Sequence, residues 1–375
     1  MKERRVDVFL NDRQVGTLAE TTDHLVAFAY TEDWIRDGFA VSPFSLPLEK
    51  RVFVPVKHTF GGLWGAFADS LPDAWGRLLV DRMLAARGRN PEDVSELERL
   101  SVVGDSGMGA LSYCPAWETW DETLPGDLDD LCEKCSALLL HKDTEDPDEI
   151  FRLGGSSGGA RPKIMTGEWI IKFPSSREMT DSGLMEKEYM DCAAACGILV
   201  PETKLMPSRR CSGYFAVRRF DRQRIESRLI RRHVLTAAAI LEADWRTGTM
   251  DYSTLMKLTQ ILSRSNKADL LQMYRRMCFN VFAHNRDDHL KNFSWIYDET
   301  ADCWHPSPAY DLTWSTTWFG EHTLTVNGNS RDPAVNDLVA VGAAAGIPAR
   351  LCRQVAEEIQ VLAVPLEEKY RNIRS

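Results

Sequence analysis

The sequence predicts an α+β fold of two lobes that follow an N-terminal β-rich accessory subdomain. Residues near the N-terminus alternate between apolar and polar as strands do, and a second β-rich segment spans about 150–220. From about residue 230 onward the pattern is mainly helical. An acidic stretch over 118–149 marks a boundary between parts. We therefore expect three parts, at 1–118, 119–221 and 222–375.

The first part is expected to begin with a β-hairpin. Val6, Val8 and Leu10 alternate with polar residues, and Asn11-Asp12 has the composition of a turn before the next strand. Further strands are expected at 24–30 and 51–54. Helical patterns then follow at 78–84 and 97–100, and a glycine-rich stretch at 102–111 enters a strand.

The second part carries strand patterns at 169–173 and 213–217, with a helix between them at about 185–196. A shorter helix is expected at 131–140, inside the acidic boundary region. The third part is expected to form the helical lobe.

Composition indicates a soluble globular protein. The chain has 375 residues, of which 44% are hydrophobic and 27% charged. No apolar run is long enough to cross a bilayer and no signal peptide is evident, so we expect a cytoplasmic protein without a membrane partner. The net charge of −10 argues against wrapping of nucleic acid over much of the surface. The nine cysteines are expected to be reduced, with Cys132 and Cys135 in a structural role.

A short loop in the third part has the pattern of a phosphoryl-transfer site. Asp287 lies five positions before Asn292, directly after a long apolar segment. In kinases an aspartate of this kind orients the acceptor hydroxyl and takes its proton, while the asparagine binds a magnesium ion. A solvated helix-capping loop would have the same spacing, so the interpretation depends on companion motifs.

The densest glycine cluster of the chain supplies the first companion. Residues 154–163 read Gly-Gly-Ser-Ser-Gly-Gly-Ala-Arg-Pro-Lys, and such a loop presents backbone N–H groups to phosphate oxygens. It matches neither the Walker A nor the dinucleotide-binding pattern. Lys172 follows in an apolar strand, where a kinase needs a lysine that holds the phosphates. Its carboxylate partner is expected from the following helix, as either Glu186 or Glu188.

Asp311 lies 19 residues after Asn292 and supplies the metal-binding aspartate that a kinase requires downstream of its catalytic loop. Together the four elements favour phosphotransfer. A rival interpretation takes His284, Asp287, Asp288 and His289 as the metal cluster of a hydrolase. The rival leaves the glycine loop and Lys172 without a task. In the kinase interpretation, His289 orients the loop or touches the nucleotide.

These motifs together resemble the HipA family of bacterial serine/threonine kinases, the toxins of toxin-antitoxin pairs. The family pattern N-x-D-x-H-x-K-N-F-S is filled by residues 285–294. The resemblance also covers the glycine loop, the strand at 170–174, the Val-Arg-Arg-Phe-Asp-Arg segment at 217–222 and Tyr310-Asp311. Near the start, Leu-Pro-Asp-Ala-Trp-Gly-Arg at 71–77 and Gly-Ala-Leu at 109–111 are similar to motifs of the family's N-terminal region.

The resemblance implies a two-lobed, protein-kinase-like fold, with ATP and magnesium bound between the lobes. Asp287 would be the catalytic base, Asn292 and Asp311 the magnesium ligands, and Lys172 the phosphate lysine. Nucleotide contacts are expected from Gly155, Ser156, Ser157, Gly158, Gly159, Ala160 and His289. The segment Arg218, Arg219, Phe220 and Asp221 would form the hinge beside adenine, with its backbone groups as contacts. HipA-type kinases can phosphorylate a serine of this loop, and Ser156 or Ser157 corresponds. Such a phosphate would place about two negative charges where ATP phosphates bind.

The family also implies partners. These are a small, HipB-like helix-turn-helix antitoxin, DNA reached only through that antitoxin, and a protein substrate such as an aminoacyl-tRNA synthetase. An alternative function is a catalytically silent HipA-like corepressor or scaffold bound to a helix-turn-helix partner. Seven arginines between 218 and 232 make that segment locally basic, with a solvated charged surface as the simplest interpretation.

Overall fold

The N-terminal region forms an antiparallel five-stranded sheet with the strand order β4-β3-β2-β1-β5. The computed structural model describes residues 4–117, 126–140, 153–154, 159, 161–175, 181–226, 228–247, 250–317 and 320–371. The strands of this sheet are β1 (Arg5–Leu10), β2 (Arg13–Glu20), β3 (Val26–Tyr30), β4 (Val52–Phe53) and β5 (Leu111–Cys114). Asn11 and Asp12 join β1 to β2 with φ of 44° and 71°, which confirms the predicted turn.

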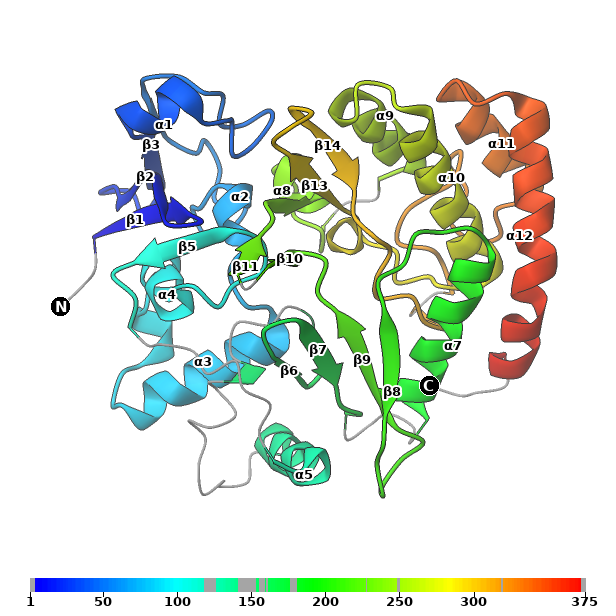
Figure 1. The fold of residues 1–375 in the computed structure, drawn as a ribbon, viewed down its shortest axis with the longest axis horizontal. Coiled ribbons are helices and arrows are strands. Elements are labelled where there is room, and N and C mark those ends of the chain that lie inside the picture. The colour runs from blue at the N-terminus through cyan, green and yellow to red at the C-terminus, as the bar shows by residue number, and fades with distance from the viewer. Residues whose placement is uncertain are drawn as a thin grey trace.

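The helices of the N-terminal region lie between β3 and β5 in the sequence, and most of them lie beside the sheet in Figure 1. They are α1 (Glu32–Asp37), α2 (Gly65–Ala68), α3 (Ala74–Ala86), the 3₁₀ helix η1 (Pro91–Asp93) and α4 (Glu96–Val103). Helix α4 begins with a capping box, in which Ser95 accepts from the Glu98 amide and Glu98 accepts from the Ser95 amide.

The middle of the chain forms a four-stranded antiparallel sheet with the order β6-β7-β9-β8. Its strands are β6 (Lys163–Met165), β7 (Trp169–Lys172), β8 (Thr203–Met206) and β9 (Tyr214–Arg218). The helices α5 (Leu128–Leu139) and α7 (Ser182–Ala195) belong to the same region. A hydrophobic cluster joins Trp75 and Leu79 of α3 to Leu131 of α5 and Ile171 of β7. The sheet is therefore packed against a helix from the N-terminal region.

The C-terminal part contains strands as well as the expected helices. The strands are β10 (Arg222–Ile225), β11 (Arg228–Arg231), β12 (Val234–Thr236), β13 (Ser294–Asp298) and β14 (Cys303–Pro306). The helices are α8 (Ala237–Ile240), α9 (Tyr252–Leu262), α10 (Lys267–Phe282), η2 (Leu290–Asn292), α11 (Val335–Ala344) and α12 (Ala349–Tyr370). Strands β12, β13 and β14 form one sheet, and the longer helices gather on the opposite side of Figure 1 from the N-terminal sheet.

The largest hydrophobic cluster runs from Val6 in β1 to Tyr370 at the end of α12. Gly65 at the start of α2 lies so close to α8 that an added Cβ would be 2.4 Å from the Ala239 carbonyl oxygen. The N-terminal region is thus packed directly on the C-terminal part, while the division at 118 and 221 stays a prediction. None of the helices in the described ranges has the length and apolar character needed to cross a membrane.

Candidate active site

Lys172 ends strand β7 with its ammonium group in a buried cluster of charges. Its Nζ donates to Glu186 Oε1 on α7 at 2.5 Å, and Glu186 also accepts from Arg161 at 2.9 Å. Glu188 points elsewhere, because its carboxylate binds Lys369 and the Tyr370 hydroxyl. Of the two glutamates left open by the sequence, Glu186 is therefore the one that pairs with Lys172.

Asp311 contacts the same ammonium group from the C-terminal part, through its Oδ1. Burial alone would lower the pKa of Lys172, but the carboxylates of Asp311 and Glu186 outweigh it and raise the pKa. Burial likewise acts to raise the pKa of Asp311, and the charges of Lys172 and Lys163 hold it well below its usual range. Asp311 has a φ of 52°, a left-handed conformation that is uncommon for a residue other than glycine. Lys172 and Asp311 thus join the two lobes at one point.

The loop at 285–292 is held in shape by contacts of its backbone. The amide of Asp287 donates to Ser315 Oγ at 2.8 Å, and Asn292 Nδ2 donates to the Asp287 carbonyl at 2.6 Å. His289 accepts from the Lys291 amide at 3.2 Å and packs its ring against Trp245. These two contacts support the loop-orienting role predicted for His289, and its contact with the nucleotide stays a prediction. These contacts leave the Asp287 side chain 62% exposed, with His289 Nε2 at 3.8 Å from its Oδ1.

Partial desolvation raises the pKa of Asp287, an effect that His289 opposes and Asp311 reinforces. A carboxylate with a raised pKa is a better proton acceptor, which suits a general base.

Tyr310 links this loop to Asp311, because its hydroxyl donates to the Lys291 carbonyl at 2.7 Å. The predicted base, the predicted asparagine ligand and Asp311 are therefore tied together through short contacts.

The metal cluster of the rival hydrolase interpretation does not form. Asp288 is fully buried and accepts from Tyr252, His322 and the Thr323 amide. Its carboxylate therefore has a structural role, linking the catalytic loop to α9 and to the segment at 322–323. His284 lies apart from it, against Trp314 and 3.3 Å from Glu367. Among the described residues, no group of three or more His, Cys, Asp or Glu side chains is arranged to hold a metal ion.

The glycine loop is described at its two ends. Gly155, Ser156, Ser157, Gly158 and Ala160 lie outside the described residues. Gly159 has a φ of 84°, and an added Cβ would be 2.7 Å from Lys163 Nζ. Lys163 is paired with Lys172 across β6 and β7, so the two side chains share a face of the sheet. Burial, reinforced by the charge of Lys172, lowers the pKa of Lys163 to about 8.

Segment 218–221, the predicted adenine hinge, has two side chains that serve a structural network. The side chains of Arg219 and Asp221 are buried, and Asp221 accepts from Arg219, Arg222 and the Gly109 amide at 2.8–3.0 Å. Arg218 is exposed and pairs with Glu168 at 2.9 Å. Phe220 packs its ring 5.5 Å from that of Tyr310, beside Asp311. The Arg219 and Asp221 side chains therefore connect the N-terminal region to the lobes, while backbone contact with adenine stays a prediction.

Sequence reasoning missed several side chains around the site. Arg161 and Lys163 lie at the C-terminal end of the glycine loop, and a pair of cations at the end of a phosphate-binding loop was a signal for them. Asp73, at the start of α3, binds Lys291 of the catalytic loop with both oxygens, at 2.9 and 3.0 Å. No local pattern indicates this contact, because the two residues are 218 positions apart.

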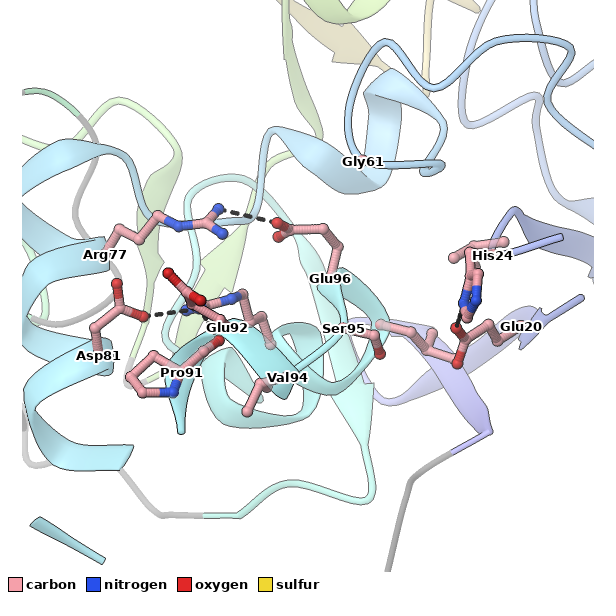
Figure 2. A pocket seen from close by; sticks show the side chains of 13 residues that line it. Glu20, His24, Gly61, Arg77, Asp81, Pro91, Glu92, Val94, Ser95 and Glu96 are labelled. Atoms are coloured by element: carbon pink, nitrogen blue, oxygen red, sulfur yellow. Dashed lines mark hydrogen bonds and ion pairs between the residues drawn. The ribbon is translucent and has the colours of Figure 1, made fainter. Parts of the chain in front are cut away.

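A cavity of about 500 Å³ lies within the N-terminal region, and none of the predicted site residues that the structure describes lines it (Figure 2). Its charged side chains bind one another. Figure 2 shows Arg77 directed at Glu96, at 2.9 Å, and His24 directed at Glu20, at 2.9 Å. Arg99 similarly pairs with Asp81 at 2.7 Å.

Comparisons with known proteins find relatives over most of the chain. Residues 155–364 match the family model of the HipA-like C-terminal domain, and residues 6–114 match that of the HipA N-terminal domain. The chain is 27% identical to the putative kinase Y4dM of Sinorhizobium fredii over 352 residues, 86% of this chain and 80% of that protein. It is 24% identical to the serine/threonine-protein kinase toxin HipA of Shewanella oneidensis over 350 residues, 83% of this chain and 75% of that protein.

The fold is also similar to that of Shewanella oneidensis HipA, solved in complex with HipB and operator DNA. The match has a TM-score of 0.72 at 20% identity and covers 99% of this chain and 92% of that one. It confirms the predicted two-lobed, kinase-like α+β fold. Both domain models and the fold thus lead to the same conclusion, that this chain belongs to the HipA family of serine/threonine kinase toxins.

Proposed function

We propose that this protein transfers the γ-phosphoryl group of ATP to a serine or threonine hydroxyl of a protein. The observation that carries the proposal is the contact of Lys172 with both Glu186 and Asp311, beside the loop of Asp287 and Asn292. A lysine held by a helix glutamate, with a metal-binding aspartate nearby, is the arrangement that protein kinases use around the nucleotide phosphates.

Each residue has a separate task in this proposal. Asp287 orients the acceptor hydroxyl and takes its proton, as a new oxygen–phosphorus bond forms and the bond to the ADP oxygen breaks. Lys172 holds the phosphate oxygens, and its position is fixed by Glu186. Lys163 adds positive charge on the same face of the sheet. Because these groups are positioned before ATP arrives, little reorganisation is needed during transfer.

Asn292 and Asp311 are the residues that would hold magnesium. Their fit rests on donor chemistry, since the site offers amide and carboxylate oxygens and Mg²⁺ is bound in kinases by one or two such ligands together with the phosphates. The lowered pKa of Asp311 keeps its carboxylate ionised at neutral pH. A bound Mg²⁺ would neutralise charge on the phosphates.

Regulation and partners extend the proposal. We assign Ser156 or Ser157 as a site of autophosphorylation that switches off nucleotide binding, because a phosphate there would repel the phosphates of ATP. The solved structure that matches this fold holds HipA with HipB and DNA, which supports a small helix-turn-helix antitoxin as partner here, with DNA reached through it. The protein substrate that we propose is a component of translation, such as an aminoacyl-tRNA synthetase.

Phosphate incorporation from γ-labelled ATP tests the function, with Mg²⁺ present and the intact mass measured before and after phosphatase treatment. We expect wild type to gain at least one phosphate and Asp287→Gln to gain none. Equal labelling of the two proteins would refute the proposed role of Asp287. Peptide mapping of the labelled chain would distinguish Ser156 from Ser157.

The alternative function is a silent scaffold bound to a helix-turn-helix partner. Isothermal titration with Mg-ATP separates it from the kinase, on protein treated with phosphatase so that both loop serines are unmodified. If the protein is a kinase, wild type binds Mg-ATP and the Lys172→Met variant binds it more weakly. A scaffold that binds the partner and no nucleotide would fit the alternative.

A further inference from the structure

The start of helix α3 touches the glycine loop at both of its described ends. The Trp75 amide donates to the Gly159 carbonyl at 3.1 Å, and the Gly159 amide donates to Asp73 Oδ2 at 3.4 Å. The Trp75 indole donates to the Lys163 carbonyl at 3.0 Å. At the loop's other end, an added Cβ on Gly154 would be 2.4 Å from the Lys163 carbonyl oxygen and 3.3 Å from the Trp75 indole nitrogen. The described ends of the loop thus pack on residues of the N-terminal region.

Asp73 also reaches the catalytic loop. Both of its oxygens accept from Lys291 Nζ, at 2.9 and 3.0 Å, and the two side chains are only 22% and 17% exposed. Lys291 lies one residue before Asn292 and four after Asp287. A single carboxylate therefore contacts the end of the phosphate loop and the loop that carries the predicted base.

The position of Asp73 in its helix makes this contact informative. Asp73 is the N-cap residue of α3, where an aspartate ordinarily accepts from an amide of the first turn and stabilises the helix. Here its side chain makes no such bond. The carboxylate is directed instead at Lys291 and Gly159, so the local contribution to helix stability is forgone for a contact between distant parts of the chain.

We propose that Asp73 is a positioning residue of the phosphotransfer site, supplied by the N-terminal region, which latches the catalytic loop to the end of the glycine loop. This inference rests on the proposed kinase function for its catalytic consequence. Holding two loops in register before reaction lowers the entropy that must be lost in the transition state. The latch also gives the 71–77 motif a task that the kinase residues alone do not explain.

The variant Asp73→Asn tests the latch, because it removes the charge while nearly keeping the shape of the side chain. Glu96→Gln is the matched control. Its ion pair with Arg77, drawn in Figure 2, has the same 2.9 Å distance and also involves a residue of α3, but neither residue contacts Lys291 or Gly159 through the bonds described above. Asp73→Glu, which keeps the charge, serves as the conservative variant.

Hydrogen–deuterium exchange without nucleotide is the first measurement. We expect Asp73→Asn to speed exchange about tenfold in peptides covering both 159–163 and 287–293, a change of about 1.4 kcal/mol in local opening. Glu96→Gln should leave both segments unchanged, and Asp73→Glu should restore much of the protection. Unchanged exchange in Asp73→Asn would overturn the latch, whatever the protein's activity.

Steady-state kinetics is the second measurement, made at a temperature where every variant is folded. We expect kcat of Asp73→Asn to fall about tenfold with KM for ATP nearly unchanged, because a group that acts only by ordering the loops is felt in the transition state. If Asp73→Asn only destabilised the fold, its melting temperature would fall, but kcat of the folded protein would not fall selectively relative to KM. If wild type shows no transfer but exchange responds as expected, the latch stands and the kinase function fails.

Discussion

Asp221 and Asp287 were both expected at the nucleotide site, yet their surroundings differ in kind. Asp221 is 1% exposed, and two buried arginines and the Gly109 amide saturate its oxygens. The arginines outweigh the effect of burial and hold its pKa well below the usual range. Asp287 is 62% exposed, and its hydrogen-bonded contacts to Ser315 and Asn292 are made by its backbone. A saturated carboxylate stabilises structure, whereas an open one is available to a substrate.

Asp221→Asn should give the largest loss of stability and so sharpen this comparison most. The substitution leaves the buried cations Arg219 and Arg222 without a full counter-charge, which costs about 3–5 kcal/mol in the free energy of unfolding. Urea denaturation followed by tryptophan fluorescence would measure it. A loss below about 1 kcal/mol would show that the network is not structural.

Lys172→Met removes the cation shared by the two lobes. Loss of one positioned charge at a transferring group typically lowers the rate by about 10²–10³-fold, or roughly 2.7–4 kcal/mol. We expect phosphate incorporation to fall by this factor. Lys187→Met is a suitable control, because Lys187 lies on α7 as well and pairs with the exposed Asp191. Equal rates for the two variants would remove Lys172 from the site.

Asp69 lies between Asp221 and Asp287 in character. Its two carboxylate oxygens accept from the Thr236 amide and hydroxyl at 2.7 and 2.9 Å, and Lys291 and Asp73 are close enough to affect its charge. Burial raises its pKa from 3.8 to about 6, although Lys291 opposes the shift. The folded chain therefore holds the proton more tightly, and this group destabilises it progressively as the pH rises from about 4 to 6. The free energy of unfolding of Asp69→Asn, measured relative to that of wild type, should therefore rise by about 2–3 kcal/mol between about pH 4 and 6. A pH-independent difference in unfolding free energy would contradict this.

Arg218→Ala should have the smallest effect, although Arg218 is only three residues from Asp221. Its side chain is 46% exposed, and its pairs with Glu168 and Glu202 are screened by solvent. Surface pairs of this kind contribute less than about 1 kcal/mol. A shift in melting temperature as large as that of Asp221→Asn would break the distinction between buried and exposed partners.

The sequence predicted a phosphotransfer site from residue types in a definite order, namely the glycine loop, Lys172, Asp287, Asn292 and Asp311, because each residue type has a definite role around a phosphate. The structure brings Lys172 and Asp311 into contact, while the roles of these residues stay predictions. The choice between Glu186 and Glu188 could not be predicted from the sequence. The two side chains point to different sides of α7, and only the packing of that helix decides which one meets Lys172. The burial of Asp221 and the reach of Asp73 to Lys291 depend on contacts between distant segments, which no local pattern encodes.

The adjacent residues Asp287 and Asp288 give the most direct test of the central claim, that the exposed carboxylate of Asp287 serves phosphate transfer while the buried carboxylate beside it serves stability. Phosphate transfer and urea unfolding should be measured on Asp287→Asn and Asp288→Asn side by side. We predict that Asp287→Asn loses about 10²–10⁴-fold in transfer rate with its unfolding free energy kept within about 0.5 kcal/mol. Asp288→Asn should lose about 1–3 kcal/mol of stability, because its buried partners lose an acceptor. Transfer by Asp287→Asn at the wild-type rate would contradict the account.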